Sequence, residues 1–164
     1  SPGRISGAGL RSRGFLATVT NILIVDDDPA VRAGLALLVR ACGWAPHAFE
    51  SGDALLAAFA PEAGAGEALL RDPVCMLLDL QMPGLTGPEV QDAMRERGID
   101  IPTVIVTAYA EHPLAERARR QGAVAVLRKP VLTNQLRDVV EQALLRYRGR
   151  LEVLDAARAR PCQG

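Results

Sequence analysis

The chain alternates between short apolar runs and longer segments in which apolar residues recur at helical spacing. The apolar runs cover residues 22–25, 44–49, 74–78, 104–106 and 123–127, and we expect each of them to form a strand. Four of the five are almost continuously apolar, which is typical of parallel strands whose two faces are both buried. The run at 44–49 mixes apolar and polar residues, so it is the best candidate for an edge strand.

Each run is followed by a segment that predicts a helix, and four of the five helices have a recognisable N-cap. The expected caps are Asp28 (before Pro29), Ser51, Thr86 and Thr133. Residues 61–73 carry Gly, Ala and Pro instead, and we expect a long, mobile connection there. Five repeats of strand and helix predict an α/β fold with right-handed crossovers. The usual solution is a flavodoxin-like, doubly wound five-stranded parallel sheet of order 2-1-3-4-5 with five helices.

The 164 residues are enough for one domain with a sizeable core. We expect this domain to span residues 21–146. Residues 1–20 are interpreted as a disordered leader or a remnant of cloning. Residues 147–164, where the periodicity weakens, are interpreted as a helical extension or a linker.

The formal net charge of zero hides an uneven distribution of charge. Arginines are concentrated near both ends, whereas acidic residues outnumber basic ones between residues 21 and 145. Affinity for nucleic acid requires clustered basic residues, so this acidic core is expected to attract a cation instead. No apolar run reaches the roughly 20 residues of a membrane span. The cysteines lack metal or redox spacing and indicate reduced, buried thiols of a cytoplasmic protein: Cys42, Cys75 and Cys162.

The candidate chemistry is concentrated where the expected strands end. Asp26 and Asp27 follow the first strand, and Asp79 follows the third. Because the carboxyl ends of parallel strands meet at one edge of the sheet, we expect these carboxylates to share a crevice. Their mutual repulsion requires a cation, and a ligand set made only of oxygen favours Mg²⁺. Asp28 is better interpreted as a helix cap.

A hydroxyl and an ammonium group complete the set. Thr107 ends the fourth strand, where a threonine is common, and Lys129 follows the fifth. Lys129 is more informative, because it is the only lysine among 19 basic residues. We therefore expect a compact, flexible point charge to act there in a way that a planar guanidinium would not.

Four stretches carry these residues in order: ILIVDDDPAVR (22–32), MLLDLQMPGLTG (76–87), IPTVIVTAYA (101–110) and GAVAVLRKP (122–130). With them the sequence resembles the receiver domain of bacterial two-component response regulators over residues 21–146. The resemblance implies a phosphoacceptor signalling domain that catalyses only its own phosphorylation and dephosphorylation. It implies that Asp79 accepts a phosphoryl group from a sensor histidine kinase or a phosphotransfer protein. The resulting change of conformation would control an output domain or a partner.

The resemblance also implies roles for the other residues at the strand ends. Asp27 would bind Mg²⁺ directly, and Asp26 would bind it directly or through water. Asp79 and the backbone carbonyl of Gln81 would complete the set of protein ligands. The remaining roles concern the phosphoryl group and the chain around it. Thr107 would donate a hydrogen bond to that group, Lys129 would pair with it, and a cis peptide bond would precede Pro130.

Two positions depart from the family pattern. Val126 stands where the family usually carries a Tyr or Phe that changes rotamer on activation, and Val131 stands where an aromatic residue often follows Lys-Pro. The chemistry should survive both changes, but Val126 is too small and too stiff to serve as the aromatic read-out. We expect the signal to travel through the loop after Thr107, which carries Tyr109.

Three other functions compete with this interpretation. A phosphatase of the haloacid dehalogenase type also uses an aspartyl phosphate, and Asp26 and Asp28 match its D-x-D spacing. Against it, Asp28 begins a helix and no acid pair follows Lys129. A docking module that is never phosphorylated would not need the full set of acids, and a nucleotide-binding protein would need a glycine-rich loop after the first strand. A homodimer, and an output domain or partner after residue 164, are both compatible with the sequence.

Overall fold

The computed structural model describes residues 19–159 of the protein. Most of the expected leader (residues 1–20) and Cys162 lie outside this range. Of the other two cysteines, Cys75 is buried as predicted, whereas Cys42 ends a helix and is partly exposed.

Within the described residues, five parallel strands form one sheet: β1 Asn21–Val25, β2 Ala45–Phe49, β3 Val74–Leu78, β4 Thr103–Thr107 and β5 Ala125–Arg128. Their order is β2-β1-β3-β4-β5, which confirms the predicted doubly wound topology. β1, β3 and β4 are buried along their whole length, whereas β2 lies at an edge and is partly exposed, as its mixed composition predicted. β1 and β3 are neighbours, so the residues that follow these two strands lie side by side.

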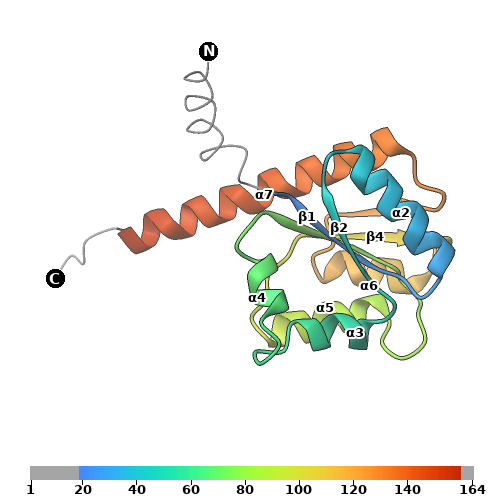
Figure 1. Cartoon of the computed structure of the whole chain (residues 1–164), viewed down its shortest axis with the longest axis horizontal. Helices are drawn as coiled ribbons and strands as arrows, with labels where there is room; N and C mark the ends of the chain where they lie inside the picture. The colour runs from blue at the N-terminus through green and yellow to red at the C-terminus, as the bar shows by residue number, and fades with distance from the viewer. Residues whose placement is uncertain (1–18, 160–164) are drawn as a thin grey trace, which may run out of the picture.

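Six helices surround the sheet in the range 19–159, one more than predicted: α2 Pro29–Ala41, α3 Gly52–Ala58, α4 Ala65–Leu69, α5 Gly87–Glu96, α6 Pro113–Arg120 and α7 Thr133–Ala159. α2 and α7 cover one face of the sheet, and α3, α5 and α6 cover the other (Figure 1). Alternate residues of β1 point to the two faces: Ile22 and Ile24 pack under α2 and α7, while Leu23 and Val25 pack under the helices opposite. The protein therefore has an apolar core on each side of the sheet.

The N-caps explain where most helices begin. The predicted caps Asp28, Ser51 and Thr86 all accept hydrogen bonds from backbone N–H groups of the first turn. Thr133 is instead the first residue of α7. The cap of α6 was not predicted: His112 accepts a hydrogen bond on its ring Nδ1 from the backbone of the first turn.

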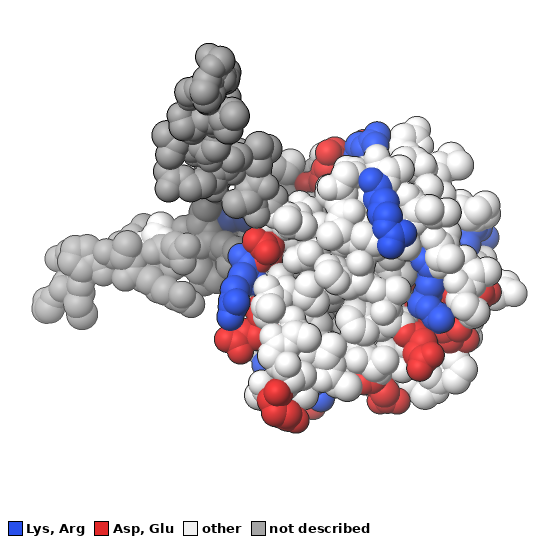
Figure 2. Space-filling model, in the orientation of Figure 1, with Lys and Arg blue, Asp and Glu red and all other residues white. Residues whose placement is uncertain are grey.

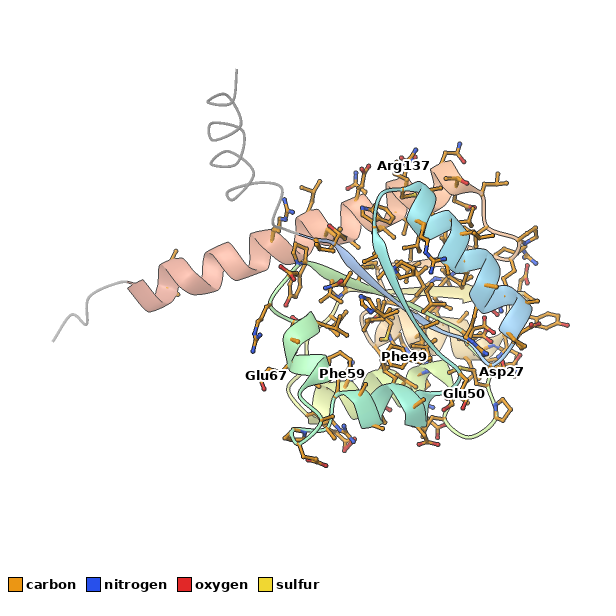
Figure 3. The ribbon with its side chains drawn as sticks, viewed as in Figure 1. Asp27, Phe49, Glu50, Phe59, Glu67 and Arg137 are labelled. Carbon is orange, nitrogen blue, oxygen red and sulfur yellow. The ribbon has the colours of Figure 1, made fainter. Side chains whose placement is uncertain are left out.

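The connection between α3 and β3 contains the additional helix, α4. Gly64 precedes it with a φ of 73°, a conformation that glycine adopts without strain. A Cβ atom on Gly66 would lie 2.4 Å from the ring of Phe59, so this short helix packs closely over that side chain (Figure 3). A helix of five residues has no apolar period that a sequence pattern can reveal. The prediction of five helices was therefore one short.

α7 is continuous from Thr133 to Ala159, and its C-terminal part projects beyond the sheet and the other helices (Figure 1). The segment 147–159 therefore continues the helix. The domain boundary expected at residue 146 falls inside it and stays a prediction. Among the helices in the described range, none combines the length and the apolar character needed to cross a membrane.

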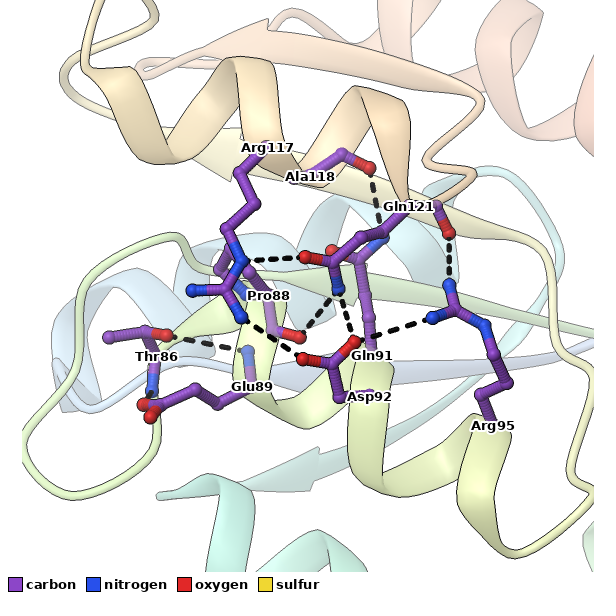
Figure 4. A network of polar contacts seen from close by, with 9 residues as sticks. All are labelled: Thr86, Pro88, Glu89, Gln91, Asp92, Arg95, Arg117, Ala118 and Gln121. Atoms are coloured by element: carbon purple, nitrogen blue, oxygen red, sulfur yellow. Dashed lines mark hydrogen bonds and ion pairs between the residues drawn. The ribbon is translucent and has the colours of Figure 1, made fainter.

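α6 is held against α5 largely by polar contacts. Its fully buried side chains, Ala115 and Ala118, are small, and its Leu114 is half-buried against the core. Asp92 on α5 accepts hydrogen bonds from Arg117 at 3.0 Å and from the side chain of Gln121 at 2.8 Å (Figure 4). These contacts hold the C-terminal half of α6 against α5.

Gly87 brings the start of α5 against the end of β3. Its N–H donates to the carbonyl of Leu80 at 2.8 Å, and a Cβ atom at Gly87 would lie 2.8 Å from the carbonyl oxygen of Asp79. That oxygen belongs to the backbone, so it cannot move aside as a flexible side chain could. The close approach therefore fixes the segment that carries Asp79.

We expect Gly87→Ala to destabilise the protein by about 1–3 kcal/mol, because the added methyl group overpacks this contact. Urea denaturation measures the effect. Gly34→Ala is the matched control: Gly34 lies in the middle of α2, a Cβ atom there would meet nothing within 4 Å, and the change should stabilise by roughly 0.5–1 kcal/mol. Equal stability of Gly87→Ala and the wild type would show that the end of β3 is not constrained in this way.

Candidate functional site

Three carboxylates meet at the carboxyl edge of the sheet. Asp26 follows β1 and Asp79 follows β3, and only 1% and 7% of their respective surfaces are exposed. Asp27 is exposed and lies at the same edge as Glu50, which follows β2 (Figure 3). One oxygen atom from each of Asp26, Asp27 and Asp79 lies within 4.8 Å of the others. The structure therefore brings together the three acids that the sequence singled out.

Asp26 is bonded through all of its polar atoms. Its N–H donates to the carbonyl of Phe49 at 3.2 Å, and its own carbonyl accepts from Nη1 of Arg32 at 2.7 Å. The carboxylate oxygen Oδ1 accepts from the N–H of Asp28 at 2.9 Å, and Oδ2 accepts from Nζ of Lys129 at 2.7 Å. A buried charge is tolerated only with such partners.

Lys129 supplies the positive charge of the site. Its Nζ lies 2.7 Å from Oδ2 of Asp26 and 3.5 Å from Oδ1 of Asp79. Its backbone N–H donates to the carbonyl of Thr107 at 2.8 Å, which ties the end of β5 to that of β4. Burial lowers the pKa of Lys129, but the hydrogen bond to Asp26 and the attraction of both carboxylates outweigh burial and raise the pKa overall. Lys129 is therefore charged and offsets part of the repulsion between the two buried acids.

Asp79 has a strongly perturbed pKa. Burial and the repulsion from Asp26 raise the pKa of Asp79 to about 6, against the opposing effects of Lys129 and of the Leu80 N–H, which donates to Oδ1 at 2.8 Å. A bound cation would favour the ionised form. A carboxyl group that is perturbed in this way at the edge of a parallel sheet is a candidate for chemistry.

Thr107 ends β4 at the same edge of the sheet as the acids. Its side chain is buried, and its Oγ1 accepts a hydrogen bond from the N–H of Tyr109 at 3.1 Å. In the part of the chain that the structure describes, its hydroxyl forms no hydrogen bond to the three carboxylates. The hydroxyl therefore secures the loop after β4, and its contact with a phosphoryl group stays a prediction.

Gln81 lies in the loop after β3, and its side chain is exposed. The nitrogen of its amide lies 3.2 Å from Nε2 of His112, the residue that caps α6. This contact brings the loop after β3 and the loop after β4 together beside Asp79. The role of the Gln81 backbone carbonyl as a metal ligand stays a prediction.

The donor set of this cluster fits a hard divalent cation. Its three acidic members offer only oxygen atoms, which are the ligands that Mg²⁺ prefers. Among the side chains that the structure describes, the carboxylate of Asp27 has no hydrogen-bonding or ion-pair partner, so it is free to bind an ion. When all three carboxylates are ionised, their negative charge also exceeds the single positive charge of Lys129. The cluster can therefore hold a metal ion.

Two residues beside the site were missed by the sequence analysis. Arg32 lies in the first turn of α2 and turns back to the carbonyl of Asp26. Its spacing from the cap Asp28 was the available signal, because a residue four positions after a cap lies one turn along the helix. His112 precedes Pro113, the same cap-proline pattern as Asp28-Pro29.

The region expected to read out the switch has no aromatic side chain inside it. Val126 is half-buried and packs against the core under α3, α5 and α6. Tyr109, in the loop after β4, is 64% exposed. Glu111 of the same loop forms an ion pair with Arg128 at the end of β5. Val131 lines an apolar hollow of about 440 Å³ next to Lys129.

Comparison with known proteins places the chain among signalling proteins. Residues 22–141 match the family model of the response regulator receiver domain. The C4-dicarboxylate transport transcriptional regulatory protein DctR of Rhodobacter capsulatus is 33% identical over 83% of this chain and 66% of its own length. The transcriptional regulatory protein FixJ of Bradyrhizobium diazoefficiens is 32% identical over 79% of this chain and 58% of its own length. The chain thus spans less than two thirds of the length of these relatives.

Solved structures agree with the observed fold. A low-resolution structure of the response regulator StyR superposes with a TM-score of 0.71 at 30% identity, covering 86% of this chain and 67% of StyR. The crystal structure of FixJ-N superposes with a TM-score of 0.65 at 30% identity, covering 76% of this chain and 93% of FixJ-N. These likenesses confirm the flavodoxin-like sheet and helices.

The raised pKa of Asp79 predicts a specific dependence of stability on pH when Mg²⁺ is absent. Between the ordinary value of 3.8 and about 6, the folded protein retains a proton on Asp79 that the unfolded chain has lost. The contribution of Asp79 to stability should therefore fall as the pH rises from about 4 to about 6. Urea denaturation in EDTA at several pH values measures this fall.

Asp79→Asn is the matched control, because it keeps the shape of the side chain and removes the titration. The difference in stability between wild type and Asp79→Asn should change with pH over this window. This pH dependence should become smaller when Mg²⁺ is added. If the stability difference between the two proteins did not change with pH, the raised pKa of Asp79 would be contradicted.

Proposed function

Because the chain belongs to the response regulator receiver family, we propose that Asp79 is the phosphoacceptor of a Mg²⁺-dependent switch in two-component signalling. The observation that supports this most is the position of Lys129 between the buried carboxylates of Asp26 and Asp79. An ammonium group there lies where a transferred phosphoryl group would need a counter-charge. Phosphoryl transfer needs a positioned nucleophile and neutralisation of the phosphoryl oxygens, and little covalent help beyond that.

In the proposed reaction, an ionised oxygen of Asp79 attacks the phosphorus atom of a phosphohistidine or of a small donor such as acetyl phosphate. The new O–P bond forms while the bond from phosphorus to the donor breaks, and the leaving group keeps that electron pair. Asp79 has to be ionised for the attack. The raised pKa of Asp79 in the cation-free protein therefore links the reaction to occupation of the acidic cluster.

Four groups would hold Mg²⁺ beside Asp79: the carboxylates of Asp26, Asp27 and Asp79 and the backbone carbonyl of Gln81. Bound there, the ion would neutralise the carboxylates and the oxygens of the incoming phosphoryl group. Lys129, which contacts both buried acids, would pair with a phosphoryl oxygen. Asp27 is the acid best placed to bind directly, since both carboxylate oxygens of Asp26 already accept hydrogen bonds.

Thr107 connects the site to the rest of the molecule. Its hydroxyl accepts a hydrogen bond from the backbone of Tyr109, and a turn toward a phosphoryl oxygen would give up that bond. The loop from Thr107 to α6 would then rearrange, together with its ion pair between Glu111 and Arg128. With Val126 in place of a ring, this loop and α6 are the elements that would carry the signal.

The rival phosphatase function loses support from the position of Asp28. Oδ1 of Asp28 accepts hydrogen bonds from the first backbone N–H groups of α2, at 2.9 and 3.4 Å. The second acid of the D-x-D spacing is therefore used as a helix cap. It is not part of the cluster formed by Asp26, Asp27 and Asp79.

The partners proposed for this domain follow from the same function. A sensor histidine kinase or a phosphotransfer protein would donate the phosphoryl group, in the cytoplasm. The part of the relatives that this chain does not span would correspond to an output domain. We assign no nucleic-acid binding to the receiver itself, since acidic residues outnumber basic ones between residues 21 and 145. On the face seen in Figure 2, acidic and basic side chains are interspersed.

The test is phosphorylation by acetyl phosphate and Mg²⁺, followed by mass spectrometry of the intact protein. Wild type should gain one phosphoryl group, and Asp79→Asn should gain none because it lacks the nucleophile. Asp28→Asn is the matched control: this acid caps a helix outside the cluster, and the variant should still be labelled. Labelling of Asp79→Asn to the same extent as wild type would refute the assignment.

A further inference from the structure

Arg32 reaches back from the first turn of α2 to the segment that carries the acids. Its Nη1 donates to the carbonyl oxygen of Asp26 at 2.7 Å, and the side chain is half-buried. This contact is separate from the capping of α2, which Asp28 provides. It therefore adds a long side chain to the restraints on the segment from Asp26 to Asp28.

The other restraints act on the two ends of this segment. The N–H of Asp26 is bonded to the carbonyl of Phe49, and the N–H of Asp28 is bonded to Oδ1 of Asp26. Asp27, between them, has a carboxylate without a partner among the described residues. Its direction is therefore set only by the backbone on either side, and Arg32 fixes the carbonyl that immediately precedes Asp27.

The two cations near the cluster are used differently. Lys129 contacts carboxylate oxygens, so it shares them with any ion that binds. Arg32 forms no ion pair with any side chain that the structure describes; its hydrogen bond goes to a backbone carbonyl instead. Arg32 therefore occupies none of the carboxylate oxygens while it holds the segment in place. The planar guanidinium donates in a fixed direction, which suits this task.

We propose that Arg32 is a positioning residue of the cation site: it holds the Asp26–Asp28 segment so that the carboxylate of Asp27 stays beside that of Asp79. This inference rests on the metal site of the proposed function and adds a residue to it. Groups that orient metal ligands commonly change metal affinity by 10- to 100-fold when they are removed. If Arg32 acts by positioning Asp27, its removal should weaken Mg²⁺ binding. A pure charge effect would change the affinity in the opposite direction. Removal of a positive charge near the acidic cluster would remove its repulsion of Mg²⁺, and this change alone would tighten the binding of the ion.

The test is Mg²⁺ affinity, measured by isothermal titration calorimetry without any phosphodonor. Arg32→Met keeps an unbranched stem and a high helix propensity but removes the donors. We expect its Kd to be weaker by about tenfold, with part of the affinity restored in Arg32→Lys. Arg40→Met is the matched control, because Arg40 is exposed in the last turn of the same helix and should leave the Kd unchanged.

The outcomes separate the inference from the function on which it rests. Thermal unfolding without Mg²⁺ first shows whether each variant is folded. Wild-type binding together with equal or tighter binding by Arg32→Met would overturn the role of Arg32 and leave the metal site standing. Absence of Mg²⁺ binding by the wild type would overturn the metal site, and the role of Arg32 with it.

Discussion

Repulsion between carboxylates gathered at one edge of a parallel sheet is the constraint on which the rest of this structure depends. Asp26 and Asp79 are both buried because their strands, β1 and β3, are neighbours in the middle of the sheet. Two buried negative charges at neighbouring strand ends repel each other and are unfavourable without a counter-charge. Lys129 provides one positive charge from the end of β5, but burial and then the repulsion from Asp26 still raise the pKa of Asp79. The site is therefore poised to bind a cation.

The elements around the site hold the acids in this unfavourable arrangement. Gly87 lets α5 begin directly against the backbone of Asp79, and Arg32 holds the carbonyl of Asp26 from α2. Thr107 and Lys129 are joined through the backbone, so the hydroxyl, the ammonium and the acids belong to one connected edge. On the far side of the loop after β4, α6 is held by a polar network around Asp92 (Figure 4). Its fully buried apolar residues are small, and its Leu114 is half-buried against the core. A helix held in this way can move with less loss of apolar burial than one with a large buried face.

The sequence predicted the sheet order and the approximate position of the acids, because both follow from strand ends and from continuous apolar runs. Asp26 and Asp79 stand directly after such runs, and Asp27 and Lys129 stand one residue further on. α4 could not be predicted, since its small residues pack on Phe59 through a contact that leaves no period in the sequence. The bond from Arg32 to Asp26 and the hydroxyl of Thr107 facing Tyr109 depend on side-chain directions, which spacing alone does not determine.

Thermal unfolding with and without Mg²⁺ tests most directly whether the acidic cluster is a cation site held under repulsion. At a Mg²⁺ concentration ten times the Kd, linkage predicts a gain of about 1.4 kcal/mol, or a rise in Tm of roughly 4–6 °C. An equal ionic strength of NaCl is the control for screening. Asp27→Ala should lose most of the rise, because it removes the carboxylate that is free to bind the ion. No rise in wild type at millimolar Mg²⁺, or an undiminished rise in Asp27→Ala, would contradict the account.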